Sequence, residues 1–417
     1  MTCRRLYHVV ESLAAYLLQA FKCAVLPWAS PLQRLSLAHR SEMAPQAALS
    51  DTSALLILKG ATYLITGFEA LLGITMESTN VQQVSPVSCA KGVAFMRTNT
   101  RGQALVPVTA SASNVLSLHG TADRPVCPWH SHISGIAGVK MITTGRNHAL
   151  IVLVDGRVLS FGHTRSGALG HGDRQSRDGP TEIHALRGVE VTHAAAGLDH
   201  SLFVSTKGEA WTCGQGTHGQ LGLGATDEAL VPQYIKELPK GQVAHCAAAV
   251  HTSCFLLHDG SAWTCGNGRF GILGHGHKKT LLVPRLISRP CPSVSGFVRC
   301  FFGSTHGLFL AFDRITSAAW SSTGVHAPIR ASVLGVGSNN NGQLGGVPGH
   351  EVLRPRELTL PSGLTPVDIA VSTNASLIVV KGGQFLVIAH GVIQRCTLKE
   401  CSGRMSVSQA ALCSVSS

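Results

Sequence analysis

The sequence predicts an all-β protein built as a β-propeller, in which small antiparallel sheets surround one axis. Three observations favour this fold. Three consecutive segments between residues 145 and 276 repeat one pattern at a constant spacing of 52 residues. Each copy contains two short apolar runs on either side of a turn, as a β-hairpin does. None of the copies carries the period of an amphipathic helix, so the repeated unit is a sheet, one blade of a radial array.

The hairpin turn of each copy is marked by a glycine. The three turns are Asp155-Gly156, Lys207-Gly208 and Asp259-Gly260, and each lies between apolar runs. A two-residue hairpin turn needs a residue that adopts a positive φ angle, which glycine does without steric cost. The repeat therefore predicts a pair of antiparallel strands around each glycine.

Residue size predicts which strand of each copy lies closest to the axis. Small residues open the copies at 143–145, 194–197 and 247–249, and the strands nearest a propeller axis are too crowded for large side chains. Trp211 and Trp263 stand in later strands of their copies, where the sheets spread apart. We therefore expect each copy to run outward from the axis.

The repeated positions resemble the repeat of the regulator of chromosome condensation family, the RCC1-like repeat. The second copy carries the pattern from Gly197 and His200-Ser201 to the run at 219–222. The third copy departs from the pattern, with Ala249 and Thr252 in place of the glycine and the histidine. This resemblance implies a seven-bladed β-propeller of RCC1-like repeats. The structural glycines of the repeats are Gly145, Gly162, Gly167, Gly197, Gly214, Gly219, Gly266, Gly271, Gly303, Gly337 and Gly342.

Weaker copies extend the array along the chain. Residues 53–73 and 88–125 carry two degraded copies before the three clear ones. A sixth copy restarts at Cys300 and has a lengthened hairpin loop around 317–331, and a worn seventh copy occupies 367–389. The count of copies agrees with the number of blades that the resemblance implies.

Three segments follow from this count. Residues 51–400 form the propeller, residues 401–417 a Ser-rich C-terminal tail, and residues 1–50 an N-terminal extension. The extension is amphipathic, bears arginines and has few acids, which is typical of a mitochondrial presequence; an ordinary N-terminal extension is the alternative. We expect an intracellular protein, mitochondrial if the presequence acts and cytoplasmic or nuclear otherwise. No uninterrupted run of about 18 apolar residues is present, so the sequence predicts no transmembrane segment.

The composition bears on partners and on the compartment. A formal net charge of +12 suits nucleic acid or acidic lipid, but the cations are scattered, which favours a solvated basic surface. The 13 cysteines form no short-range pairing pattern, which fits a reducing compartment. Cys213 and Cys265 share one repeat position, and we interpret them as small buried residues rather than ligands.

The motifs that could carry chemistry are incomplete. The loops at 214–219 and 266–271 satisfy G-x-G-x-x-G, but a dinucleotide site also needs a following helix, so we interpret them as blade loops. Cys127, His130 and His132 supply only part of a four-ligand zinc site. The sequence therefore predicts no cofactor, no metal and no residue for covalent catalysis.

Three histidines, His148, His200 and His306, share one repeat position, and equivalent positions of a propeller lie on one face. In one interpretation each imidazole bonds backbone carbonyls of its own or the next blade and stiffens the rim. In the other, which the resemblance implies, the histidines and Asp199 form part of a face that docks a partner. Ala375 interrupts the ring of histidines in the last copy.

Three functions follow as hypotheses. The first is a non-catalytic scaffold, a monomeric propeller that binds a protein partner within a complex. The second, which the resemblance implies, is a guanine-nucleotide exchange factor for a small GTPase, an activity that rests on differential binding and needs no covalent chemistry. The loop around 317–331 is a poor match to the inserted wedge of the family's exchange factors. The third is a mitochondrial RNA- or ribosome-associated factor, suggested by the basic balance.

Overall fold

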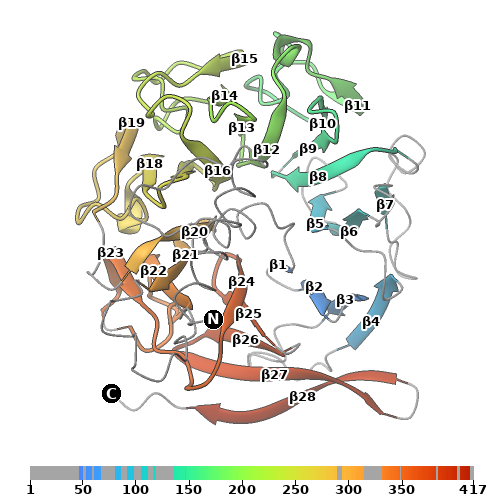
Figure 1. Ribbon diagram of the computed structural model, residues 1–417, viewed down its shortest axis with the longest axis vertical. Helices are drawn as coiled ribbons and strands as arrows, with labels where there is room; N and C mark the ends of the chain where they lie inside the picture. Colours follow the sequence, from blue (N-terminus) through green and yellow to red (C-terminus); the bar gives the residue numbers. More distant parts are fainter. Residues whose placement is uncertain are drawn as a thin grey trace, which may run out of the picture.

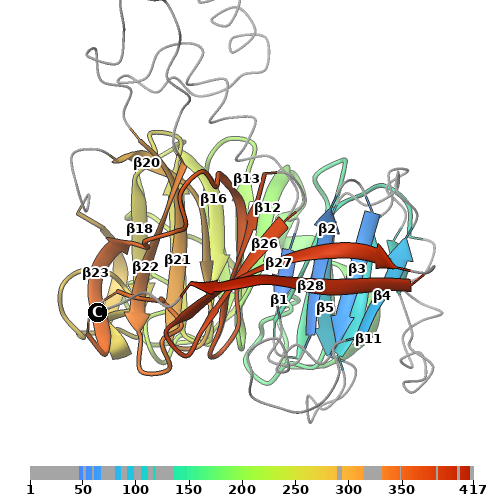
Figure 2. The same ribbon diagram turned by 90° about the horizontal axis from the view of Figure 1, so that it is seen from below.

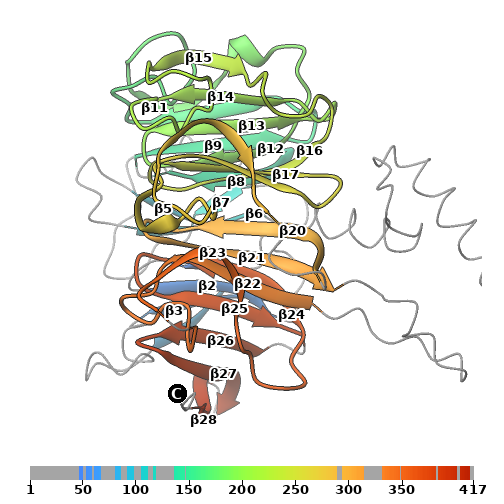
Figure 3. The ribbon, with the colours of Figure 1, turned by 90° about the vertical axis from the view of Figure 1, so that its left-hand side faces the viewer.

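A computed structural model describes residues 136–145, 147–288, 294–313, 331–347, 349–381, 384–401 and 404–413, together with the strand backbone between residues 47 and 118. The described residues form seven antiparallel sheets, which surround a common axis (Figure 1). In both side views the strands run along the direction of this axis (Figure 2 and Figure 3). The predicted all-β propeller is confirmed, and the number of blades in the whole chain stays a prediction.

The first two sheets come from the weak copies of the repeat. The first sheet contains β1 (Ala47–Leu49), β2 (Ser53–Leu58), β3 (Ala61–Thr66) and β4 (Asn80–Ser85). The second sheet has three described strands, β5 (Gly92–Arg97), β6 (Leu105–Ala110) and β7 (Leu116–Leu118). The apolar runs that the sequence assigned to degraded copies therefore form paired strands.

The clear copies form three four-stranded sheets with the same order. The third sheet contains β8 (Val139–Thr144), β9 (His148–Leu153), β10 (Val158–Gly162) and β11 (Arg177–Glu182). The fourth contains β12 (Val191–Ala196), β13 (His200–Ser205), β14 (Ala210–Gly214) and β15 (Ala229–Tyr234). The fifth contains β16 (Val243–Ala248), β17 (Thr252–Leu257), β18 (Ala262–Gly266) and β19 (Leu281–Leu286). Two short 3-10 helices, η1 (His184–Leu186) and η2 (Arg269–Gly271), lie between these strands.

The last two sheets are larger. The sixth contains β20 (Val294–Phe302), β21 (His306–Asp313), β22 (Ala331–Ser338) and β23 (Glu351–Glu357). The seventh contains β24 (Pro366–Val371), β25 (Ser376–Val380), β26 (Gln384–Ala389), β27 (Val392–Cys401) and β28 (Arg404–Cys413). Most of the expected lengthened loop around 317–331 lies outside the described residues. So do residues 1–46 of the expected N-terminal extension at 1–50, whose residues 47–49 form β1.

The innermost strands close the ring. Each of β1, β5, β8, β12, β16, β20 and β24 contacts the next, and β24 contacts β1. The prediction that the small-residue segments lie nearest the axis is confirmed for β8, β12 and β16 (Figure 1). Small side chains there let neighbouring sheets approach closely.

The tail expected at 401–417 contains a strand instead. β28 pairs antiparallel with β27 from Ile393↔Cys413 to Cys401↔Arg404, so the seventh sheet gains a fifth strand. Both strands run across the outside of the ring, and β28 contacts β4 (Figure 2). Backbone pairing with β27 orders a Ser-rich segment that has no blade pattern of its own, because main-chain hydrogen bonds do not depend on side-chain type.

The hydrophobic core lies between neighbouring sheets. One buried cluster joins the third and fourth sheets, and further clusters join the fourth to the fifth, the fifth to the sixth and the sixth to the seventh. Cys213 and Cys265 are fully buried within these clusters, as predicted, and burial raises the pKa of both thiols far above the usual range. Sheet-to-sheet packing is therefore the main source of stability.

The outermost strands of the third to sixth sheets are protected as edges. A proline occupies one equivalent position in β11, β15, β19 and β23: Pro180, Pro232, Pro284 and Pro355. A loop of the preceding sheet also donates to the strand, from Gly172 N to Leu230 O (2.9 Å) and from Gly224 N to Leu282 O (3.0 Å). These devices oppose pairing with another chain. Among the described residues no helix has the length and hydrophobicity needed to cross a membrane.

Candidate functional site

The histidine positions define one end of the propeller. His148, His200 and His306 begin the second strand of their sheets, opposite the glycine that ends the third strand. The turn before the second strand and the loop after the third strand therefore lie at the same end. We call this end the histidine face; it consists of residues 145, 147, 197–199, 249–251, 303–305 and 372–374 and the loops 163–168, 215–220, 267–272 and 338–343.

Each of His148, His200 and His306 is hydrogen-bonded to a serine of the next sheet. The Nε2–Oγ pairs are His148–Ser201 (2.9 Å), His200–Ser253 (3.0 Å) and His306–Ser376 (2.9 Å). Each serine directly follows the next histidine position along the chain. Three seams between sheets are therefore bridged by side chains.

Each serine also bonds back to the sheet that carries its histidine. The hydroxyls of Ser201, Ser253 and Ser376 donate to the carbonyls of Ala168 (2.7 Å), Gln220 (2.6 Å) and Gln343 (2.8 Å). Because the single hydroxyl proton is used there, the imidazole Nε2–H is the donor in the histidine–serine bond. The bridge therefore needs a proton on Nε2, which in a neutral imidazole leaves Nδ1 without one.

Burial keeps these imidazoles neutral. Removal from water lowers the pKa of His148 to about 4 and the pKa values of His200 and His306 to about 3. All three side chains are buried, so they hold neighbouring sheets together and are not displayed on the surface of the face. The three histidines thus link neighbouring sheets, as in the rim-stiffening interpretation. The partner of each imidazole Nε2 is a serine hydroxyl, whereas that interpretation expected a backbone carbonyl.

The repeat glycine and the histidine depend on one another. A Cβ on Gly145 would lie 2.6 Å from His148 Cε1, and one on Gly197 would lie 2.5 Å from His200 Nδ1. A Cβ on Gly145 would also meet the backbone oxygen of Gly197, and one on Gly197 the backbone oxygen of Ala249. The ring and the backbone of the next sheet together therefore occupy the space that any other residue would fill. In the fifth sheet both members are replaced together, by Ala249 and Thr252.

The seam between the fifth and sixth sheets has lost its bridge. Thr252 donates to Asn267 O (3.3 Å) within its own sheet, and Gly307 stands in the sixth sheet where other sheets carry the bridging serine. The ring of Phe302 takes the vacated space, since a Cβ on Gly307 would lie 2.5 Å from Phe302 Cδ1. Phe302 also packs edge-on against Phe309, with ring centroids 5.4 Å apart. Aromatic packing thus replaces hydrogen bonding at this seam.

The exposed part of the histidine face differs from sheet to sheet. Asp199 is half-buried beside the seam between the fourth and fifth sheets, and its backbone carbonyl accepts a bond from Ser166 Oγ (3.2 Å). Across that seam His218 and His251 stack, with ring centroids 4.3 Å apart. Burial and His218 lower the pKa of His251, while Asp199 opposes that shift. The described residues contain no cluster of three or more ligating side chains suited to a metal.

Helix η2 adds a strained aromatic residue to this face. Phe270 adopts φ of +61°, a left-handed conformation that is costly for a bulky side chain. The Arg269 guanidinium lies 4.8 Å from the centre of the Phe270 ring. Sequence reasoning missed this pair, because the loop glycines on either side follow the repeat and give no sign that Phe270 departs from it.

A row of polar residues on the innermost strands was also missed. His193, His245, Arg299 and Asp368 each stand seven residues before the histidine position of their sheet and follow a β-bulge. The rings of His193 and His245 lie 5.0 Å apart, and Arg299 Nη1 donates to Asp368 Oδ1 (3.3 Å) with both side chains buried. The constant offset was visible in the sequence, but the four positions carry two histidines, an arginine and an aspartate.

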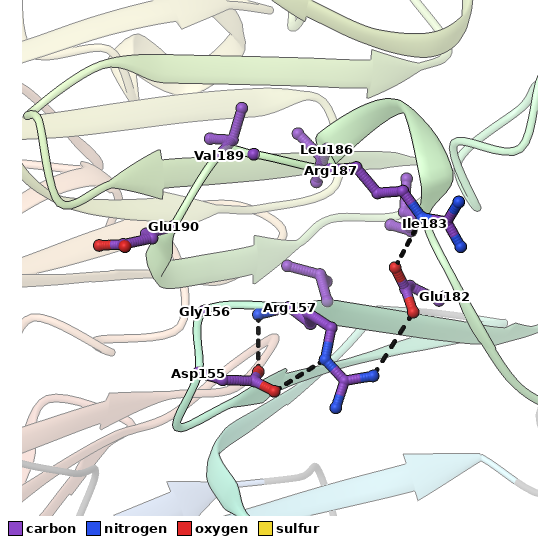
Figure 4. A pocket seen from close by; sticks show the side chains of 11 residues that line it. Asp155, Gly156, Arg157, Glu182, Ile183, Leu186, Arg187, Val189 and Glu190 are labelled. Atoms are coloured by element: carbon purple, nitrogen blue, oxygen red, sulfur yellow. Dashed lines mark hydrogen bonds and ion pairs between the residues drawn. The ribbon is translucent and has the colours of Figure 1, made fainter.

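A pocket of about 240 Å³ lies at the opposite end of the third sheet (Figure 4). Four of its five charged groups are paired with one another: Arg157 contacts Asp155 (2.7 Å) and Glu182 (3.5 Å), and Arg187 contacts Glu182 (3.1 Å). The fifth, Glu190, accepts a bond from Thr206 Oγ1 (3.3 Å). The pocket contains none of the predicted site residues. The candidate ligands Cys127, His130 and His132 lie outside the described residues.

Comparison with known proteins follows the repeat pattern. The family model of the regulator of chromosome condensation (RCC1) repeat matches residues 155–204, 207–256 and 259–310, and a second model of that repeat matches 191–220. The chain therefore contains three consecutive RCC1 repeats. These segments run from the third strand of the third sheet, β10, to the second strand of the sixth, β21.

Curated relatives match parts of the chain. The E3 ubiquitin-protein ligase HERC2 of Homo sapiens is 36% identical over 149 residues, which cover 35% of this chain and 3% of that protein. The ultraviolet-B receptor UVR8 of Arabidopsis thaliana is 32% identical over 209 residues, 49% of this chain and 47% of the receptor. The RCC2 homolog of Xenopus laevis is 33% identical over 153 residues, 35% of this chain and 30% of that protein. The chain thus spans less than half of the length of these relatives.

Solved structures show the same fold. Human WBSCR16 superposes with a TM-score of 0.57 at 21% identity, covering 81% of this chain and 87% of that one. Prp20p of Saccharomyces cerevisiae, described with its binding properties to Gsp1p and histones, gives a TM-score of 0.52 at 14% identity over 87% of this chain and 81% of that one. At these identities the likeness establishes the propeller alone.

Proposed function

We propose that this RCC1-repeat propeller is a protein-interaction scaffold that binds a protein partner at the histidine face. The observation that carries the proposal is a division of roles within the repeat. The histidine, the serine and the glycine are committed to the bridges between sheets. The residue before each histidine position is free to vary, and it is Asn147, Asp199, His251, Thr305 and Asn374 in successive sheets.

A surface built in this way suits partner recognition. The bridges hold each loop in place, so little ordering entropy is lost when a partner binds. The varied polar residues then supply hydrogen bonds and charges that differ around the ring, so a partner can bind in only one orientation. Asp199, His218 and His251 form one titratable polar group on this face.

The test compares two triple variants. Asp199→Ala/His218→Ala/His251→Ala removes this group, and Glu190→Ala/Lys207→Ala/Lys240→Ala removes exposed charges near the opposite ends of the strands. Tagged wild-type and variant chains are compared by quantitative affinity purification, and each protein recovered is then titrated in pure form. We expect the first variant to lose a partner that the wild type and the second variant retain. Equal recovery by all three chains would refute the proposal.

Guanine-nucleotide exchange is the second candidate, favoured by the likeness to Prp20p, whose structure is described with binding to Gsp1p. An exchange factor binds the nucleotide-free GTPase more tightly than the loaded one, so a docking face suffices for the activity. Release of a fluorescent guanine nucleotide from purified small GTPases measures it. If the wild type accelerates nucleotide release and the Asp199/His218/His251 variant does not, exchange becomes the favoured function over scaffolding alone.

A further inference from the structure

The outermost strand of the fifth sheet displays apolar side chains. Among the described residues five large apolar side chains are exposed, and three of them lie on β19: Leu282 (37% exposed), Val283 (38%) and Leu286 (48%). A fourth, Val231, holds the position of Val283 on the neighbouring strand β15. Exposed apolar side chains gathered on one strand mark a surface for interaction more often than scattered ones do.

Cationic side chains border these residues. The exposed ones are Lys278, Lys279, Arg285, Arg354 and Arg356, from β19, β23 and the loop before β19. Lys278 is paired with Glu351, and Glu357 accepts a bond from Ser332 Oγ (2.8 Å). The border therefore keeps an excess of positive charge. Its field reaches His275, whose pKa is lowered to about 4 by burial and by the charges of His277, Arg285 and Arg354.

The other sheets cover or neutralise the same position. Leu286 pairs in register with Trp263, as Tyr234 does with Trp211 and Glu182 with Leu159. Tyr234 packs edge-on against Trp211, with centroids 5.7 Å apart, and Glu182 is paired with two arginines. Leu286 is nearly half exposed instead. The fifth sheet thus departs at this position from the third and fourth sheets.

We infer that this surface, formed by Leu282, Val283, Arg285 and Leu286 with Lys279 and Arg354, binds an acidic segment of a protein partner that carries apolar side chains. We call it the β19 patch. Carboxylates of the segment meet the arginines and the lysine, and its apolar side chains cover the leucines and the valine. Pro284 has no N–H, and Leu282 O already accepts from Gly224 N, so side chains rather than an added strand give the recognition.

The β19 patch adjoins the outer edge of the histidine face. β19 is the outermost strand of its sheet, at the rim of the ring (Figure 1). Leu282 lies against Gly219 and Lys279 against Gly268, and both glycines belong to loops of the histidine face. The two proposals rest on different side chains, so separate variants test them.

A display experiment tests the inference. Random peptides about 12 residues long, displayed on phage, are selected on the immobilised full chain, and the enriched peptides are synthesised with a fluorescent label. We expect enriched sequences that combine acidic and apolar residues, with affinity that falls as salt rises. Arg285→Glu/Arg354→Glu is expected to weaken binding about tenfold or more, and Leu286→Ser to weaken it severalfold. Gln233→Glu, at the position on β15 equivalent to Arg285, is the matched control and should bind as the wild type does.

Three results would overturn the inference: no enriched peptide, enriched peptides without acidic bias, or unchanged affinity in Arg285→Glu/Arg354→Glu. Thermal unfolding checks that each variant is folded. Lys279→Glu lies outside the strand and serves as a second charge reversal if the double variant fails to fold. The Asp199/His218/His251 variant should bind the same peptides as the wild type does, which separates this surface from the proposed scaffold face.

Discussion

His200 donates a hydrogen bond from Nε2 to the hydroxyl of Ser253, 3.0 Å away in the next sheet. Ser253 in turn donates to Gln220 O (2.6 Å), a carbonyl of the sheet that carries His200. Each bridge therefore leaves a sheet, reaches its neighbour and returns. Loss of either side chain leaves buried polar groups without partners, which costs more than the bond itself contributes.

Removing one member of a bridge is expected to destabilise the propeller. His200→Ala and Ser253→Ala should each lower the free energy of unfolding by about 1–3 kcal/mol, and the double variant should lose less than the sum. Urea unfolding measures all three. Asn374→Ala, an exposed position on the same face, is the control and should change little. Additive losses in the double variant would contradict a direct bond between the two side chains.

Acid is expected to weaken the fold. The pKa values of His148, His200 and His306 are lowered in the folded chain to about 4, 3 and 3, whereas an unfolded histidine titrates near 6.5. Below pH 6.5 the unfolded chain binds more protons, so stability is full above that pH and is lost as pH falls toward the folded values.

Thermal unfolding between pH 7 and pH 5 measures this loss. Each buried histidine contributes up to about 1.4 kcal/mol for every pH unit in the window. His200→Gln cannot titrate, so its stability should fall less steeply than that of the wild type. A wild-type melting temperature that stays level across this range would be incompatible with neutral, buried imidazoles.

The dependence of glycine on histidine can be tested with a residue pair that the chain itself uses. Gly197→Ala places a methyl group against the His200 ring and should cost about 2 kcal/mol or more. Adding His200→Thr copies the Ala249/Thr252 pair of the fifth sheet and removes the clash with the ring, while the clash with the backbone oxygen of Ala249 remains. We expect the second change to destabilise the Gly197→Ala chain less than it destabilises the wild type, as measured by urea unfolding. If His200→Thr were equally destabilising in the wild type and in the Gly197→Ala chain, the His200 ring and a methyl group at residue 197 would not compete for the same space.

The buried ion pair of the innermost strands gives a further prediction. Asp368→Asn leaves the Arg299 guanidinium buried without its counter-charge and should cost about 3–5 kcal/mol. Arg299→Met/Asp368→Leu removes both charges and should be far less destabilising than Asp368→Asn. The same unfolding experiment compares them. A double variant as unstable as the single one would mean that packing, and not charge, sets the cost.

Much of the fold follows from the sequence, because the repeat keeps its turns and its small innermost residues. Gly156, Gly208 and Gly260 have φ of +84°, +69° and +77°, as the hairpin turns required. The partner of His200 was harder to find, since Ser253 lies one repeat further along the chain. Its signal was present in Ser201 and Ser253, which follow successive histidine positions, but residues so distant in sequence come together only once the ring is built.

The exposed surfaces could be predicted only in part. Asp199 was identified from its place beside a histidine, whereas His218 and His251 gain significance from their stacking across a seam. Leu286 could not be singled out, because its exposure depends on the absence of the cover that Tyr234 receives from Trp211 in the preceding sheet. Strand β28 was missed because backbone pairing orders it.

Every sheet among the described residues is assembled from one uninterrupted stretch of chain, and the two ends of the chain share none of them. The first and seventh sheets therefore meet, through β1 with β24 and β4 with β28, at a junction that none of the described strands crosses. A covalent linker there, with new termini cut into the exposed turn at Lys240, would leave each sheet intact. The fold of the described sheets is therefore compatible with circular permutation.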